Sequence, residues 1–345
     1  MHFCFIYDFM FIKNSFYICE IRFAYMRIKT IIILALMSSL LIGCGDDRID
    51  SRLVRIDAMM DDNPRGALDS LERIDRAEMS AGDSFYYELL KIKASDKAYV
   101  RHESDSEVIK VIDYYKSHGD DDLYAEALYY GGRVYSDLGD YPTSLRYFQD
   151  ALDRLPADTD NQKLRGHVLS QTGRLLNKLR LYDEAAKYLV ELVKLDSVYD
   201  DSVNLVLDQQ LLGAVLVHSG QYDRAKKHFK NIRSLSETTL PENTAVHDMY
   251  LAAIECDNGN LDSALLIIRG VPESVPDGYR STAIAYAAEI YHNAGLYDSA
   301  YMYSKMLLDS KVLNYRLNAY KILLSSEEIK LVDKDDIMEY IESYN

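Results

Sequence analysis

The sequence predicts an all-α solenoid, a right-handed superhelix of about seven helical hairpins. The first observation is a short pattern that recurs at intervals of 41, 40, 39 and 36 residues. The second is a small residue at a fixed distance before and after each copy. A repeat with a period between about 20 and 50 residues is typical of solenoids and related arrays. The copies are Gly139-Asp140-Tyr141, Arg180-Leu181-Tyr182, Gly220-Gln221-Tyr222, Gly259-Asn260-Leu261 and Gly295-Leu296-Tyr297.

Small residues flank each copy and indicate two helices that pack closely. Seven residues upstream of the copies stand Gly132, Gly173, Gly213, Ala252 and Ala288, and downstream stand Ser144, Ala185, Ala225, Ala264 and Ala300. A glycine at the turn tolerates positive φ and ends the first helix. An acidic residue or Pro142 then favours the start of the second helix, through the helix dipole or the absent N–H. Each copy is therefore predicted to be the turn of a helical hairpin.

These residues resemble the tetratricopeptide repeat (TPR). The best copy carries small or aromatic residues at the places where the family has them, although Leu128 and Gly131 depart from its usual Trp and Leu; the matching residues are Gly132, Tyr135, Gly139, Tyr141, Ser144, Phe148, Ala151 and Pro156. The resemblance is clearest over residues 125–308. It implies a TPR-type solenoid over residues 49–345, with capping helices over 313–343 that carry charge on their outer face.

Two stretches upstream of the clear repeats also predict helices. Residues 63–74, with Pro64 near the start and Leu71 and Ile74 further on, have the pattern of a second helix of a degenerate hairpin. Residues 84–117 contain two further helical patterns. No Gly/Ser-rich linker divides the array, so one continuous superhelix is expected.

The N-terminal region predicts a membrane anchor. A positive segment at Met26–Lys29 precedes a short apolar run at 31–42, and residues 26–43 therefore have the pattern of a signal peptide. Leu41-Ile42-Gly43-Cys44 resembles a bacterial lipobox, which implies cleavage before Cys44 and lipid on its sulfur and amino group. Residues 44–48 would form the lipidated tether. Residues 1–25 fit no leader, and we expect Met26 to be the true start.

Composition and motifs argue against several functions. The chain has 39 Lys+Arg against 55 Asp+Glu, a net charge of -16, which is atypical of a nucleic-acid binder. The eight His and four Cys lack metal-ligand spacing, and no Gly-rich phosphate loop or nucleophile motif is present. The Asp257–Asp262 stretch is interpreted as a repeat turn and not as a calcium loop. We therefore expect no enzyme, no metal and no cofactor.

The TPR resemblance implies that five places on the first helix of each hairpin face a concave groove. Basic residues gather at these places in the first half of the array and suggest a groove for an acidic or carboxylate-bearing peptide. The candidate groove residues are Lys93, Lys97, Arg101, Tyr129, Arg133, Arg174, Asn177 and Lys178. In the last hairpin the same places hold Thr282, Ala285, Glu289, His292 and Asn293. The alternative is that the cations pair with acids on neighbouring helices.

These expectations converge on a lipoprotein of a Gram-negative envelope. The leading interpretation is a non-enzymatic scaffold that binds a protein or peptide in its groove and is held by the lipid on Cys44, at the outer membrane. A second interpretation is an extracytoplasmic sensor that acts through a separate regulator. A third is a surface lipoprotein that captures glycans.

Overall fold

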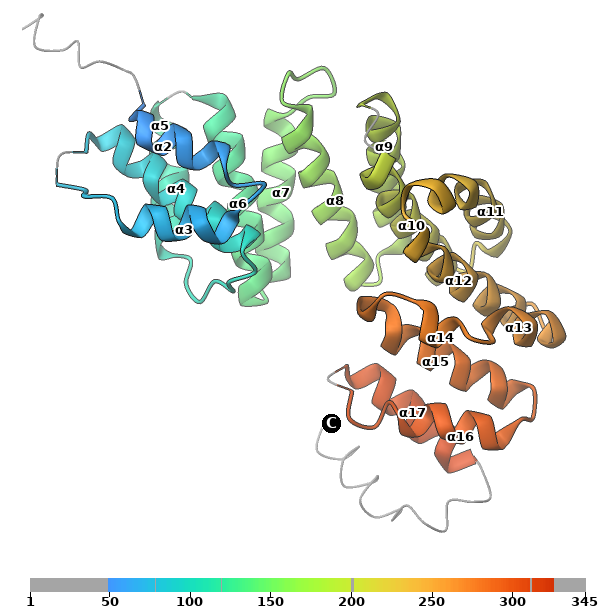
Figure 1. Ribbon diagram of the computed structural model, residues 1–345. Coiled ribbons are helices and arrows are strands. Elements are labelled where there is room, and N and C mark those ends of the chain that lie inside the picture. Colours follow the sequence, from blue (N-terminus) through green and yellow to red (C-terminus); the bar gives the residue numbers. More distant parts are fainter. Residues whose placement is uncertain (1–48, 78, 119, 200–201, 311, 326–345) are drawn as a thin grey trace, which may run out of the picture. The chain divides into compact units, whose positions relative to one another are not determined.

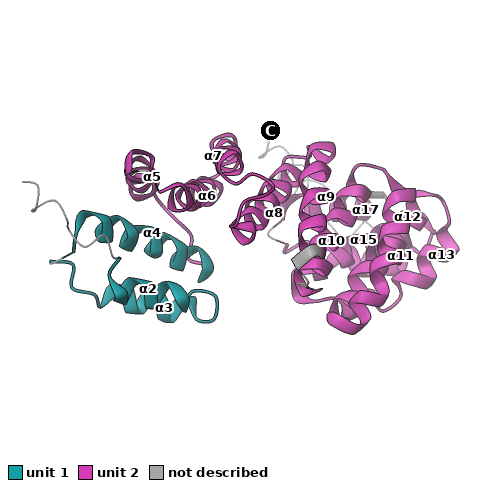
Figure 2. Ribbon diagram, turned by 90° about the horizontal axis from the view of Figure 1, so that it is seen from above, with its two compact units in different colours: residues 1–98 teal, residues 99–345 magenta. Residues whose placement is uncertain are grey.

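The structure is a computed structural model that describes residues 49–77, 79–118, 120–199, 202–310 and 312–325. The predicted upstream segment 1–25, signal peptide 26–43 and lipidated tether 44–48 with Cys44 lie outside the described residues, as does the part of the capping segment after Ser325. The chain forms two compact units, residues 1–98 and 99–345 (Figure 2).

Unit 1 contains three described helices. They are α2 (Ser51–Ala58), α3 (Pro64–Glu72) and α4 (Ala81–Lys97). The side chain of Asn63 caps α3 by accepting a hydrogen bond from the Gly66 N–H, and Pro64 occupies the first turn, where an N–H is not needed. Leu53, Leu71 and Leu89 are fully buried, so the three helices share one small core.

Unit 2 is a succession of helices in which neighbours along the chain pack side by side (Figure 1). The predicted repeats are the pairs α6 and α7, α8 and α9, α10 and α11, α12 and α13, and α15 and α16. The bounds are α5 (Ser106–His118), α6 (Asp121–Leu138), α7 (Tyr141–Arg154), α8 (Gln162–Lys178), α9 (Tyr182–Tyr199), α10 (Ser202–His218), α11 (Tyr222–Thr239), η1 (Pro241–Asn243), α12 (Thr244–Asp257), α13 (Leu261–Ile268), α14 (Val271–Ser274), α15 (Asp277–Asn293), α16 (Tyr297–Lys305) and α17 (Leu313–Ser325).

The close approach predicted within each hairpin is present. A methyl group added at Gly132 would lie 2.3 Å from the Phe148 ring, and one at Gly213 would lie 2.5 Å from the Phe229 ring. At Gly173 the nearest atom would be a Leu189 methyl carbon at 2.5 Å. The second small residue of each hairpin is buried as well. The repeat pattern therefore marks contacts between helices, as predicted.

The hairpin turns share one backbone geometry. In the last four repeats the residue directly after the left-handed position donates its N–H back to the preceding helix, as in a Schellman motif. The left-handed residues Gly139, Gly220, Gly259 and Gly295 have φ between 72° and 85°. In the turn between α8 and α9 the same position is held by Arg180, at φ 61°. This turn thus keeps the hairpin geometry without glycine.

Two short helices were not expected from the repeat pattern. Gly270, with φ 79°, lies after the end of α13 and changes the direction of the backbone. The four-residue helix α14 follows, with Pro272 in its first turn. The 3₁₀-helix η1 begins at Pro241, which provides a fixed φ at the first position. The fourth repeat is consequently closed by a shortened second helix. A continuous apolar core extends from Leu169 on α8 to Ile322 on α17.

The described helices are those of an all-α solenoid, as predicted. Within the described ranges no helix has an apolar stretch long enough to traverse a bilayer.

Candidate functional site

The two candidate groove cations of unit 1 form ion pairs with the preceding first helix. Lys93 Nζ lies 2.7 Å from Asp57 Oδ1, and its side chain is only 15% exposed. Lys97 Nζ lies 2.8 Å from Asp61 Oδ1, just after α2. Asp57 also accepts a hydrogen bond from the Tyr86 hydroxyl at 2.9 Å. These two lysines link α4 to the end of α2.

The next two cations, Arg101 in the connection after α4 and Arg133 on α6, also contact residues of a following first helix. Arg101 donates through Nε to the Asp137 carbonyl oxygen at 3.0 Å, and the Asp137 carboxylate accepts from the His102 backbone N–H at 3.1 Å. Arg133 on α6 donates to the Gln171 side-chain oxygen on α8 at 2.7 Å. Arg133 is half-buried in this position. Both arginines therefore join consecutive repeats.

Two of the three candidates at the end of α8, Arg174 and Asn177, also contact the next repeat. Arg174 lies 3.9 Å from Asp208 on α10, and this carboxylate is 12% exposed. The Asn177 side-chain oxygen lies 3.1 Å from the His218 ring nitrogen Nδ1. Lys178 is different, because its ammonium lies 4.4 Å from the centre of the Tyr141 ring in a cation–π contact.

Tyr129, which was proposed to face the groove, is buried. Its side chain is 6% exposed and packs against the rings of Tyr130, Phe148 and His167. Tyr129 on α6 therefore packs toward α7 and α8, as a core residue does.

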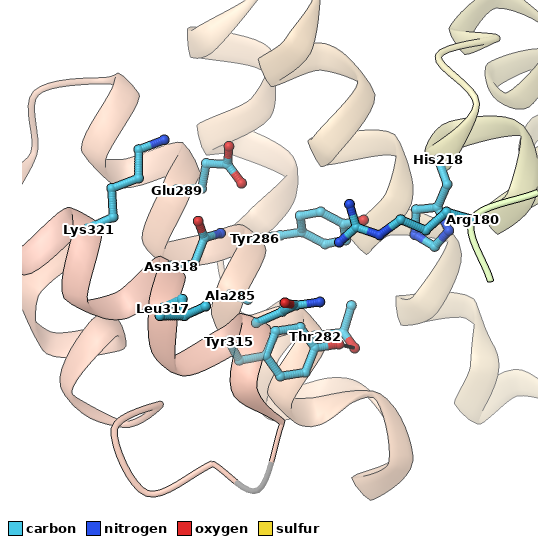
Figure 3. A pocket seen from close by; sticks show the side chains of 11 residues that line it. Arg180, His218, Thr282, Ala285, Tyr286, Glu289, Tyr315, Leu317, Asn318 and Lys321 are labelled. Carbon is cyan, nitrogen blue, oxygen red and sulfur yellow. Dashed lines mark hydrogen bonds between the residues drawn. The ribbon is translucent and has the colours of Figure 1, made fainter. Parts of the chain in front are cut away.

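A pocket of about 440 Å³ lies in unit 2, lined mainly by helices α15 and α17 (Figure 3). Helix α15 contributes Thr282, Ala285, Tyr286 and Glu289, and α17 contributes a second wall. The other lining residues are Arg180, His218, Asn314, Tyr315, Leu317, Asn318 and Lys321. The Thr282 and Tyr315 hydroxyls lie 2.6 Å apart and join α15 to α17. This volume falls within the range of about 300–1,000 Å³ that is usual for small-ligand pockets.

Three charged side chains of the pocket stand apart from the paired cations. The side chains of Arg180, Glu289 and Lys321 form no hydrogen bond or ion pair with another described residue. In Figure 3, Tyr286 lies between Glu289 and Arg180, and Lys321 lies on the other side of Glu289. The pocket therefore presents a cation, an anion and a second cation in that order.

Burial perturbs the titration of these groups. Burial, and then the negative charge of Asp257, raises the pKa of Glu289, while Lys321 and His292 oppose the shift. Burial also raises the pKa of Tyr286, with further contributions from Tyr315 and Glu289. Burial lowers the pKa of His218, and the positive charge of Arg180 lowers it further. The pocket thus favours the neutral form of its own acid.

Part of this pocket lies at positions that the sequence placed in the groove. Thr282, Ala285 and Glu289 occupy predicted groove places on α15. Arg180 stands at a place where the other copies have glycine, but no role was predicted for it. The residues of α17 were missed, because the capping segment was expected to carry its charge outward. The arginine at position 180, in a place where the other copies have glycine, is a further signal in the sequence that could have pointed toward this pocket.

Groups of His, Cys, Asp and Glu able to hold a metal ion are absent from the described residues. The buried thiol of Cys256 accepts a hydrogen bond from the Asn293 side chain, and burial raises its pKa. A thiol with a raised pKa is a poor nucleophile.

Comparisons with known proteins support the TPR-type fold. No known family profile matches the chain. Human tetratricopeptide repeat protein 29 is 27% identical over 144 residues, which is 41% of this chain and 30% of the human protein. The chain thus matches less than a third of that relative's length.

Several solved structures share the fold. The apo form of RapI superposes with a TM-score of 0.64 at 14% identity, over 85% of each chain. NprR in complex with its cognate peptide NprX has a TM-score of 0.61 at 13% identity, over 87% of this chain and 89% of that one. The Rap conjugation gene regulator of plasmid pLS20, in complex with the Phr* peptide, has a TM-score of 0.54 at 13% identity over 86% of each chain. This chain is a TPR-like α-solenoid.

Proposed function

We propose that the protein is a non-enzymatic, lipid-anchored TPR-type protein of the bacterial envelope that binds a peptide or an extended protein segment through unit 2. The observation that carries the proposal is the pocket on helices α15 and α17, which is lined by the charged side chains of Arg180, Glu289 and Lys321, and these have no hydrogen-bond or ion-pair partner among the described residues. Pockets with a few convergent polar groups are the usual ligand sites of proteins.

Two further facts support a peptide as the ligand. NprR and the plasmid pLS20 Rap regulator share the fold and are described as complexes with peptides. Helical hairpins stacked in one direction also form extended concave surfaces, which suit an extended chain. A regulatory role through a separate partner is the second candidate, because one of these proteins is described as a gene regulator.

The anchor part of the proposal is supported by the sequence alone. The positive segment, the short apolar run and the lipobox-like residues before Cys44 stand in the order that lipoproteins require. Two or more acyl chains hold a protein stably at a membrane. Metabolic labelling with a fatty acid tests this part: we expect the wild type to be labelled and Cys44→Ala to be unlabelled. Equal labelling of both proteins would exclude lipid attachment at Cys44.

Site-specific photocrosslinking in intact Gram-negative cells tests the binding part. A photoreactive amino acid at Asn318 faces the pocket, whereas one at Lys187 on α9 lies at an exposed place away from it. We expect a crosslinked peptide or protein from position 318 and none from position 187. The same products from both positions, or no product from position 318, would contradict binding in the pocket.

A further inference from the structure

The turn between α8 and α9 carries an arginine where glycine would be easier to accommodate. Arg180 has φ 61°, and the four equivalent turns carry glycine at φ between 72° and 85°. A residue with a Cβ in the left-handed region costs roughly 1–2 kcal/mol. Strained backbone positions of this kind cluster at functional sites. Tyr99 is the other described non-glycine residue with positive φ, at 58°, so a role for the Arg180 side chain has to be argued from its surroundings.

The fold makes no visible use of the Arg180 guanidinium. It is exposed and forms no hydrogen bond or ion pair with another described residue. It lines the pocket beside His218, and Figure 3 shows it directed toward the hydroxyl end of Tyr286. Arginine presents its donors in a planar fork that matches a carboxylate. A ligand carboxylate is the group that suits this position.

Glu289 brings a negative charge to the pocket, opposite in sign to that of Arg180. Its carboxylate is half-buried on α15 and has no hydrogen-bond or ion-pair partner among the residues that the structure describes. Burying an ionised group without a partner is unfavourable, and a ligand cation would remove that cost. The rings of Tyr286 and Tyr315 lie in the same pocket and can also contact a cation. A ligand ammonium or guanidinium group suits this position.

The order of charges sets the pattern of the ligand. Arg180, Glu289 and Lys321 follow one another across the pocket, with Tyr286 between the first two (Figure 3). A complementary ligand presents an acidic, a basic and an acidic group in sequence. The pocket volume of about 440 Å³ has room for only a short segment of a peptide. The carboxylates can come from side chains or from a chain end.

We propose that this pocket binds a short peptide segment in which a basic side chain, held by Glu289, is flanked by carboxylates held by Arg180 and Lys321. The proposal rests on the proposed peptide-binding function and specifies its ligand. It also moves the binding site away from the cations of α6 and α8, which have partners within the fold.

A library of random short peptides, passed over the immobilised full-length protein in detergent, tests the proposal. Peptides retained by the wild type are identified by mass spectrometry. We expect several-fold enrichment of Lys or Arg with an acidic neighbour. Glu289→Gln is expected to lose the enrichment of basic residues, and Arg180→Gly to lose enrichment of acidic residues on one side. Glu184→Gln, at an exposed position on α9, is the matched control and should retain the wild-type pattern.

A charge-reversing substitution at Glu289 distinguishes a change in ligand preference from a loss of binding through unfolding. Glu289→Lys is expected to retain peptides in which an acidic residue replaces the basic one, and thermal melting checks that every variant is folded. Retention of the wild-type pattern by Glu289→Gln, or no basic enrichment by the wild type, would overturn the inference. If the library finds no ligand while the crosslinker at Asn318 still captures a protein, the inference is wrong and the proposed function stands. Failure of both would remove the proposed function as well.

Discussion

Two regions of unit 2 use charged side chains in opposite ways. On α6 and α8, Arg133 and Arg174 contact Gln171 and Asp208 of the next repeat and so help to join the repeats. At the pocket, Arg180, Glu289 and Lys321 have no such partners among the described residues. In a chain with 55 acidic and 39 basic residues, a cation such as Arg180 that forms no ion pair with an acid is informative. The comparison indicates that a candidate ligand site is distinguished from a structural contact by charged side chains that have no partner inside the fold, and not by the sign of their charge.

The largest expected effect concerns a titratable group that has no partner but lies in the core. His247 on α12 is fully buried, and neither ring nitrogen has a hydrogen-bond partner among the described residues. Burial lowers its pKa to about 4, with smaller contributions from Arg233 and His228. The unfolded chain binds a proton near pH 6.5. The stabilising effect of the neutral ring is complete above about pH 6.5 and disappears as the pH falls to about 4.

This group should account for at most about 3 kcal/mol of the free energy of unfolding between these two pH values. Urea unfolding from neutral pH down to about pH 4 measures it, with His247→Leu as the comparison. We expect the variant to show a clearly smaller decrease with acidification. An equal decrease in both proteins would mean that His247 titrates normally and that its burial has no such consequence. The difference between the two proteins would measure how much a buried imidazole without a hydrogen-bond partner changes the free energy of unfolding when it lies in the core and not in the pocket.

A smaller effect is expected where a paired region loses one partner. Asp137→Ala removes the carboxylate that accepts from the His102 backbone N–H at 3.1 Å and contacts its ring nitrogen at 2.8 Å. We expect a loss of about 2 kcal/mol in the free energy of unfolding, because a partly buried donor is left without an acceptor. Asp121→Ala removes an 81% exposed carboxylate paired with Arg154 and should cost under about 1 kcal/mol. Equal losses in chemical denaturation would contradict the structural role of Asp137.

A substitution in the turn at Arg180 is expected to increase the free energy of unfolding, whereas the substitutions at Asp137 and Asp121 are expected to decrease it. Arg180→Gly relieves a left-handed strain of roughly 1–2 kcal/mol, less the entropy that glycine adds to the unfolded chain, so a net gain of about 1 kcal/mol is expected. Gly220→Ala is the matched control, since no atom crowds that position and the substitution should cost about 1 kcal/mol through backbone conformation alone. Melting curves measure both changes. A less stable Arg180→Gly protein would show that the arginine supports the fold.

The hairpins and the positions of the groove cations could be predicted from the sequence. The glycines and small residues at a fixed spacing predicted the hairpins, since each of them marks a turn or a close helix contact that a larger residue would obstruct. The groove cations were also predicted to lie at equivalent places, but their partners were not identified. Lys97 and Arg101 contact residues 36 positions away, and Arg133 one 38 positions away, which is one repeat in each case. A search for opposite charges at this separation would have found several of the pairs.

The pocket could not be predicted from the sequence, because it depends on how helices α15 and α17 pack against each other. Helix α17 lies outside the clear repeats, so no register related Tyr315 or Lys321 to Glu289. Helix α14 also follows no repeat, because Gly270 and Pro272 interrupt a second helix that the pattern continues elsewhere. Position 180 was the exception, since an arginine in a glycine place is visible in the sequence. Its significance required the pocket, which brings it together with residues more than a hundred positions away.

The smallest expected effect is the most specific test of the pocket. Burial and the charge of Asp257 raise the pKa of Glu289 above the value of the unfolded chain. Ionisation in the folded state is therefore disfavoured above about pH 4.5, and the wild type should lose stability relative to Glu289→Gln as the pH rises through the folded pKa. Since the side chain is half-exposed, we expect only a few tenths of a kcal/mol in favour of the variant at neutral pH, and none in acid. Thermal melts of both proteins across this pH range measure it. A variant less stable than the wild type at neutral pH would mean that Glu289 has a structural partner, and the distinction between the two regions would then fail.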